Sequence, residues 1–149
     1  DLRKLLEDGT TVWMGCDVGK HMHRTLGLWD AKLFEFEEMY GVKFGLDKKD
    51  RLDYHHSLMT HAMLFTGVDA DENGVRKWRV ENSWGAKNSG EDGYYTMNDS
   101  WFDQYMFEIA APKSYLTDVM LKALETKPVV LPAWDPMGSL ACSNCGSED

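Results

Sequence analysis

Residues 60–63 (Thr-His-Ala-Met) and residues 81–85 (Glu-Asn-Ser-Trp-Gly) decide the fold that the sequence predicts. The first stretch opens a mostly apolar segment, and the second ends a segment in which polar and apolar residues alternate; both patterns are typical of β-strands. The pair Asn73-Gly74 lies roughly midway between them and favours a hairpin turn. We therefore expect two neighbouring antiparallel strands, over 59–68 and 77–82, that bring a histidine beside an asparagine.

The side chains of His61 and Asn82 can then cooperate chemically. A neutral amide oxygen that accepts the imidazole N–H fixes one tautomer and one orientation of the ring without adding a charge. An imidazole held in this way can stabilise a thiolate and later protonate a leaving amine. Trp84 can cover the hydrogen bond and exclude water, which strengthens it. A histidine and an asparagine on neighbouring strands are more often structural than catalytic, so the catalytic interpretation depends on the flanking residues.

The composition indicates one globular domain and argues against two classes of partner. The chain has 149 residues, of which 43 % are apolar and 12 % aromatic. Its net charge of −9 repels phosphate backbones and anionic lipids, so we expect no nucleic acid partner. No segment approaches the ~20 apolar residues of a membrane span, and the start Asp1-Leu2-Arg3-Lys4 is not a signal peptide. Because an initiator methionine is lacking, we expect a fragment of a longer protein.

The three cysteines, Cys16, Cys142 and Cys145, do not resemble a disulfide framework and favour a reducing, cytoplasmic compartment. Cys142 and Cys145 form a C-x-x-C pair, which is a redox motif or half of a zinc site. A structural zinc needs four ligands and no second pair is nearby, so we expect no metal, no cofactor and a flexible tail over 142–149. Cys16 ends a strand-like run rather than beginning a helix that lowers a thiol pKa, so we do not expect it to be a nucleophile. The remaining histidines are expected in polar surface roles: His21, His23, His55 and His56.

The remaining pattern predicts an α+β fold, an antiparallel sheet or small barrel with helices around it. Residues 17–29 are expected to be a loop, and 43–51 a charged and exposed segment. The other predicted elements are a helix that ends before Gly9, a strand over 11–16, a helix over 30–40 capped by Asp30 and ended by Gly41, a strand over 93–97, a short helix from Asp99 or Ser100, a strand over 107–111 and a helix from Thr117 to Glu125.

Four segments in this order resemble the papain-like cysteine peptidases and, more narrowly, the bleomycin hydrolase family: 12–20, 58–63, 77–85 and 131–138. The resemblance extends to Ala141 and corresponds to about the last third of the family's chain. It implies a papain-like α+β fold, in which residues 1–141 form the antiparallel β-barrel half with flanking helices. Within them, residues 128–141 would be a C-terminal arm.

The same resemblance implies a cysteine aminopeptidase that removes N-terminal residues from peptides. His61 and Asn82 would be the catalytic pair, whereas the nucleophilic cysteine and an oxyanion-hole glutamine would lie upstream, outside this chain. Residues implied to bind substrate are Met59, Ala62, Trp84 and Ala141. The family's C-terminal carboxylate would hold the amino group of the substrate in the cleft. This sequence departs from that pattern by continuing past Ala141, which implies trimming, folding back or an altered substrate choice.

The resemblance further implies a homo-oligomeric ring, a homohexamer. The alternative hypothesis is a catalytically inert chain that serves as an oligomerisation or interaction module, in which the aromatic stretch 101–107 would contribute to an interface. Core packing is the favoured interpretation of that stretch. A zinc or redox protein built on Cys142 and Cys145 is the third hypothesis.

Overall fold

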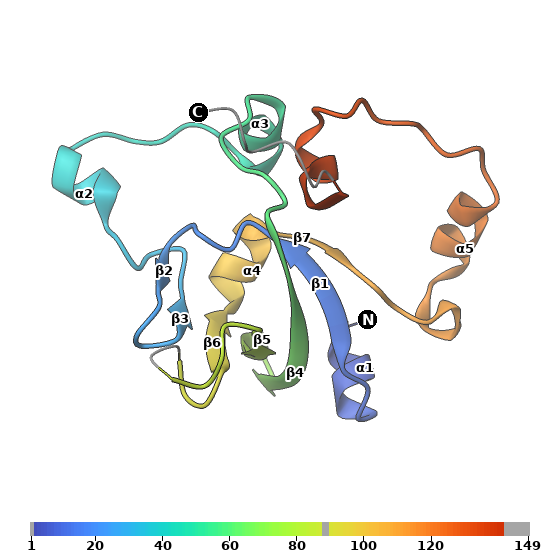
Figure 1. Ribbon diagram of the computed structural model, residues 1–149, viewed down its shortest axis with the longest axis horizontal. Coiled ribbons are helices and arrows are strands. Elements are labelled where there is room, and N and C mark those ends of the chain that lie inside the picture. Colours follow the sequence, from blue (N-terminus) through green and yellow to red (C-terminus); the bar gives the residue numbers. More distant parts are fainter. Residues whose placement is uncertain (1, 88–89, 142–149) are drawn as a thin grey trace.

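A curled sheet of seven strands forms the centre of the computed structural model, which describes residues 2–87 and 90–141, without the side chains of 139–141 (Figure 1). The strands lie in the order β2-β3-β6-β5-β4-β1-β7, and every neighbouring pair is antiparallel except β3 and β6. Their bounds are β1 Val12–Cys16, β2 Met22–His23, β3 Leu28–Trp29, β4 His61–Asp71, β5 Gly74–Glu81, β6 Tyr94–Asn98 and β7 Met106–Ile109. The predicted α+β class is confirmed as a mixed sheet with the shape of a half-barrel, in which β2 and β7 are the two edges.

Short helices surround this sheet. They are α1 Leu2–Glu7, α2 Phe36–Tyr40, α3 Lys48–Asp53, α4 Asp99–Tyr105 and α5 Asp118–Leu124, with 3-10 turns η1 Lys113–Tyr115 and η2 Pro136–Ala141. Helix α1 contacts β1 and β4, and α4 contacts β5, β6 and β7. Helix α2 and helix α5 lie away from the sheet on opposite sides of the molecule (Figure 1). The chain after α5 returns to the body at η2, which contacts α3.

The core lies on the face of the sheet that α1 and α4 cover. Alternate residues of β4 and β5 contribute to it, including the buried Met63, Phe65 and Val80. Trp29 and Trp101 are fully buried, and each indole N–H donates to a backbone carbonyl, of Val18 and Lys20 respectively. The aromatic stretch 101–107 therefore contributes to the core through its buried members, as its favoured interpretation predicts.

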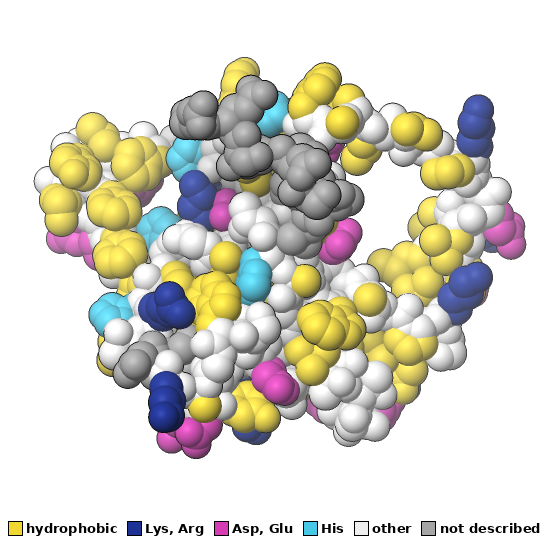
Figure 2. Space-filling view, in the orientation of Figure 1, with side chains coloured by type: hydrophobic (Ala, Val, Ile, Leu, Met, Phe, Trp, Pro, Cys, Tyr) yellow, Lys and Arg dark blue, Asp and Glu magenta, His cyan; other side chains and the backbone are white. Residues whose placement is uncertain are grey.

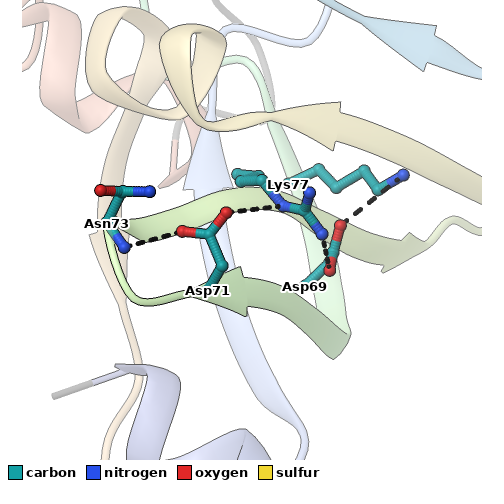
Figure 3. Close-up of polar contacts among 5 residues, drawn as sticks. Asp69, Asp71, Asn73 and Lys77 are labelled. Carbon is teal, nitrogen blue, oxygen red and sulfur yellow. Dashed lines mark hydrogen bonds and ion pairs between the residues drawn. The ribbon is translucent and has the colours of Figure 1, made fainter.

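The β4–β5 hairpin forms as predicted, but its turn lies one residue earlier than expected. Asp71 and Gly74 are cross-strand partners, so the two loop residues are Glu72 and Asn73. The backbone N–H of Asn73 donates to Asp71 Oδ1 at 2.8 Å, which closes the turn (Figure 3). Gly74 takes the only positive φ of this turn, 125°, which accounts for the glycine at that position.

Several predicted boundaries are wrong because contacts between segments distant in the sequence override local propensity. The helix expected over 30–40 is reduced to α2, and its predicted cap Asp30 instead accepts the backbone N–H of Lys32 and the amide of Asn98. Residues 17–29 contain the short strands β2 and β3, and the charged segment 43–51 contains the start of α3, capped by Asp47.

Other predictions hold closely. Gly41 ends α2 in the left-handed conformation, and Thr117 caps α5 by accepting the N–H of Met120. The short helix expected after a cap at Asp99 or Ser100 forms as α4, but its N-cap residue is Asn98 and Asp99 is its first residue. In the predicted arm 128–141, residues 128–135 form no helix or strand and include a turn closed by the Asp135 N–H and Pro132 O, and Pro136–Ala141 form η2. The predicted tail 142–149 lies outside the described residues.

Candidate active site

His61 and Asn82 occupy the adjacent ends of two paired strands, as the sequence predicts. His61 is the first residue of β4, and Asn82 directly follows β5. Leu64 pairs with Glu81, so Asn82 continues the register opposite Met63. His61 shares the face of Met63 because side chains alternate along a strand, and it therefore lies diagonal to Asn82 on the same side of the sheet.

A hydrogen bond joins the two side chains. His61 Nε2 lies 2.9 Å from Asn82 Oδ1, in a partly buried position. The same oxygen accepts the backbone N–H of Ser83 at 2.8 Å. A backbone N–H can only donate, so the atom that faces it must be the amide oxygen, and the proton of the hydrogen bond belongs to His61 Nε2. The geometry thus places the neutral ring in its Nε2–H tautomer and leaves Nδ1 as the basic nitrogen.

Further backbone and aromatic contacts hold this pair. The Asn82 N–H donates to Gly93 O at 3.1 Å, and the Asn82 side chain is buried. The indole ring of Trp84 packs against the His61 ring, with 5.3 Å between ring centroids, and forms a cover on that side of the pair. The Arg24 guanidinium lies 5.0 Å from the centre of the same indole, in a cation–π contact. The loop between β2 and β3 therefore reaches the cover of the site.

Two buried polar atoms beneath this cover have no hydrogen-bond partner among the described residues, Asn82 Nδ2 and the Tyr95 hydroxyl. The Tyr95 ring meets Trp84 edge-on, with 6.1 Å between centroids. Burial raises the pKa of the Tyr95 phenol, and the Arg24 charge acts in the opposite direction. Sequence reasoning missed Arg24 and Tyr95. No motif marks Arg24, whereas Tyr95 could have been found as the cross-strand partner of Val80.

The predicted substrate-binding residues differ in their accessibility. Ala62 is exposed and Trp84 half-buried. Met59 is buried, and its side chain packs against Gly15 of β1. The Met59 N–H donates to Pro136 O at 3.1 Å, which ties η2 to the residues just before His61. The backbone of Ala141 ends η2, and its side chain lies outside what the structure describes.

Cys16 lies directly across from His61 in the β1–β4 pairing, but it is fully buried. Burial raises the pKa of its thiol far above the ordinary value, and the adjacent Asp17 carboxylate raises it further. A protonated, inaccessible thiol is a poor nucleophile, in agreement with the sequence analysis. Asp17 is itself buried and accepts the Ser57 hydroxyl at 2.8 Å.

The other expected roles are partly corrected. His23, His55 and His56 are exposed, as predicted. His21 is not: its ring packs among Phe34, Phe36 and Tyr105 with centroid distances of 5.8–5.9 Å. Within residues 2–87 and 90–141, no three His, Cys, Asp or Glu side chains come together as a metal site, and no helix is long and apolar enough to cross a membrane. The C-x-x-C pair, Cys142 and Cys145, lies outside that part of the chain.

Comparison with known proteins gives a consistent result. Residues 2–138 match the Peptidase C1-like family. Aminopeptidase C of Listeria innocua is 46 % identical over 136 residues, which are 91 % of this chain and 31 % of the relative. Bleomycin hydrolase of Rattus norvegicus is 48 % identical over 140 residues, again 91 % of this chain and 31 % of the relative. The chain therefore spans about a third of the length of these curated relatives and corresponds to their C-terminal part.

A solved structure has the same fold. The crystal structure of pepw from Lactobacillus rhamnosis HN001 superimposes with a TM-score of 0.84 and 43 % sequence identity. The match covers 92 % of this chain and 31 % of that chain.

Proposed function

The chain belongs to the peptidase C1-like family, and on that premise we propose that it supplies the histidine and asparagine of a cysteine peptidase active site. The observation that carries the proposal is the 2.9 Å hydrogen bond between His61 Nε2 and Asn82 Oδ1, partly buried beside Trp84. An amide oxygen that fixes the ring through one nitrogen leaves the other nitrogen for proton transfer, which is the arrangement of the Cys-His-Asn triad.

In the proposed reaction, His61 Nδ1 takes the proton of a cysteine thiol. The resulting thiolate attacks the carbonyl carbon of a peptide bond, and the imidazolium returns its proton to the leaving amine as the C–N bond breaks. The same nitrogen then removes a proton from water, which hydrolyses the thioester. Asn82 stays neutral throughout and holds the ring orientation, and Trp84 keeps water away from the hydrogen bond.

We place the nucleophilic cysteine in the part of the full-length protein that the relatives have and this chain does not span. The burial and raised pKa of the Cys16 thiol support this placement. The isolated chain should therefore hydrolyse no peptide. Hydrolysis by the purified chain that thiol alkylation abolishes would contradict the placement and make Cys16 the candidate nucleophile.

We further propose that the full-length enzyme is an aminopeptidase acting on peptides. Support comes from the name of the Listeria relative and from the position of η2, whose first residue is bonded to Met59. That bond brings the C-terminal arm to within two residues of His61. An arm in this position would block the path of a long N-terminal extension and select short N-termini.

The decisive experiment replaces His61 by alanine in the full-length protein and measures hydrolysis of an aminoacyl substrate. A general acid–base contributes roughly 10²–10⁴-fold, so kcat/KM should fall by at least that range. His56→Ala, at an exposed histidine outside the His61–Asn82 site, is the matched control and should retain activity. Full activity in the His61→Ala enzyme would refute the assignment.

An additional role in assembly has a specific observation in its favour. Large apolar side chains are exposed along α5 and the following segment, with Val119 at 77 %, Val130 at 89 % and Trp134 at 73 % exposure. A partner surface would normally cover side chains of this kind. Light scattering on the full-length protein tests the proposed ring, because a mass equal to one chain at micromolar concentration would contradict it.

A further inference from the structure

A cavity lies apart from the His61–Asn82 pair, between the β1–β2 loop, the α2 region and α3. Its volume is about 660 Å³, within the range of small-molecule sites. The loop residues Gly19 to His21 form one side, and Phe34, Phe36 and Phe44 form another. Arg51 of α3 and Tyr105 at the end of α4 close it. None of its lining residues has a role in the proposed peptidase.

The charged or titratable side chains on the inner wall of this cavity are all basic: Lys20, His21, Lys43, Arg51 and His56. The adjoining hollow, which shares Arg51 and Tyr105 with it, adds the carboxylates of Glu35, Glu37 and Asp103. The chain as a whole carries a net charge of −9, so this concentration of cations runs against its composition. Lys43 is paired with Glu37 at 3.0 Å and is mostly exposed, whereas Lys20 and Arg51 have no ion-pair partner among the described residues.

Arg51 is the central cation. Its guanidinium is half-buried and donates only to neutral oxygens, those of Leu46 and Gln104, at 2.6–3.2 Å. Buried charges are normally paired with an opposite charge, so a guanidinium without a carboxylate leaves a positive potential in the cavity. Burial lowers the pKa of His21, and the nearby Arg51 charge, the next largest cause, lowers it further.

The walls around this charge are aromatic. The His21 ring stacks on Tyr105 with a centroid distance of 5.9 Å and an interplanar angle of 22°. Phe34 and Phe36 lie 5.5 Å apart beside it, and the Arg51 guanidinium lies 5.2 Å from the centre of the Tyr105 ring. Hydrophobic side chains gather on the surface over the α2 region, on the left of Figure 2. Flat apolar surfaces beside two cations without an ion-pair partner, Lys20 and Arg51, suit a flat apolar ligand that carries a negative charge.

We propose that this cavity binds an aromatic carboxylate, with its ring among Phe34, Phe36 and Tyr105 and its carboxylate facing Arg51 and Lys20. This site does not depend on the proposed peptidase reaction, so either assignment can fail without the other. The binding requires no catalytic partner from another part of the full-length protein.

Indole-3-acetate is the probe, and indole-3-acetamide, which has nearly the same shape without the charge, is its control. Titration of the folded chain is followed by two-dimensional ¹H–¹⁵N NMR at low salt. For a ligand of about 13 heavy atoms, the acetate should bind with a dissociation constant on the order of 1 mM. The amide should bind at least about fivefold more weakly, because it loses the charge-assisted hydrogen bonds. Equal binding of both probes, or saturation by neither up to about 10 mM, would overturn the proposal.

Two substitutions test the residues. Arg51→Met and Lys20→Gln should each weaken acetate binding about fivefold or more and leave amide binding unchanged. Lys122→Gln on the distant, exposed face of α5 removes the same charge and should have no effect. Because the Arg51 guanidinium also bonds Leu46 and Gln104, the Arg51→Met spectrum must first overlay that of the parent. If it does not, Lys20→Gln alone decides, and unchanged acetate affinity in that variant refutes the site.

Discussion

Replacing Asn82 by alanine tests the reasoning about the candidate active site most directly, because the structure predicts two effects of different size. Asn82 Oδ1 accepts hydrogen bonds from His61 Nε2 and Ser83 N, and both are lost. One hydrogen bond contributes about 0.5–1.5 kcal/mol, so loss of the first reduces the preference for the Nε2–H tautomer of His61 by about fivefold.

The effect on the free energy of unfolding should be smaller than two lost hydrogen bonds suggest. The substitution also removes Asn82 Nδ2, a buried donor without a partner among the described residues, and such a group costs about 1–3 kcal/mol. The cost of the two lost hydrogen bonds and the gain from removing the unpaired Asn82 Nδ2 nearly cancel. We therefore expect the free energy of unfolding to change by about 1 kcal/mol or less.

The assay for the tautomer is ¹⁵N NMR of the imidazole at about pH 8.5, where histidines are ordinarily neutral. Urea denaturation gives the stability of the same samples. Asn73→Ala, at the exposed hairpin turn, is the control and should change neither quantity by much. An unchanged His61 tautomer in Asn82→Ala would refute the claim that Asn82 orients the ring. In the full-length enzyme, Asn82→Ala should reduce kcat/KM less than His61→Ala, because the correct tautomer persists part of the time.

Three further predictions concern stability. Burial raises the pKa of the Cys16 thiol, so the thiol's contribution to stability is complete below the ordinary value of 9.0 and is lost as the pH rises above it. Above pH 9, urea denaturation should show the free energy of unfolding falling by about 1.4 kcal/mol per pH unit, and falling less steeply in Cys16→Ala. Gly27→Ala should cost more than Gly9→Ala by thermal denaturation, since both have positive φ but only at Gly27 would the new methyl meet backbone atoms, at 2.5 Å; equal costs would contradict this. Phe65→Ala should lower the free energy of unfolding by about 3–5 kcal/mol in urea, and a loss below about 1 kcal/mol would show that the cavity collapses.

The sequence predicts the candidate catalytic pair because its geometry depends on local features. The alternating polar and apolar residues of β5 show where that strand ends, and Asn82 directly follows it. The pair Asn73-Gly74 predicts the hairpin that joins β5 to β4, and all of these residues lie within one short segment of the chain. The Nε2–H tautomer of His61 could not be predicted from the sequence. It follows from the structure, in which the Ser83 N–H donates to the same Asn82 oxygen that His61 contacts. Arg24 also needed coordinates, because a cation–π contact between residues 24 and 84 leaves no periodic trace in the sequence.

The errors in the fold have a common cause. Asp30 is a residue type that commonly caps helices. Its carboxylate instead accepts a hydrogen bond from the side-chain amide of Asn98 in β6, far along the chain. Strands β2 and β3 are two residues each, too short for a periodic pattern, and they exist because β3 pairs in parallel with β6. The charged segment 43–51 appeared exposed, yet Arg51 turns inward to Gln104 of α4. Each missed feature depends on a contact between distant segments, and propensity carries no information about such contacts.

The hairpin that carries His61 and Asn82 has a consequence for the order of folding. Hairpins close in about 1–10 μs, and joining more distant segments carries a larger loop-closure cost. The β4–β5 pairing is local, whereas β1 and the Arg24 loop precede it by many residues and β7 follows it. We therefore expect His61 and Asn82 to meet early, in a solvent-open hairpin, and Arg24 to fix the indole over them later. A newly made chain would then form the His61–Asn82 contact first and exclude water from it afterwards.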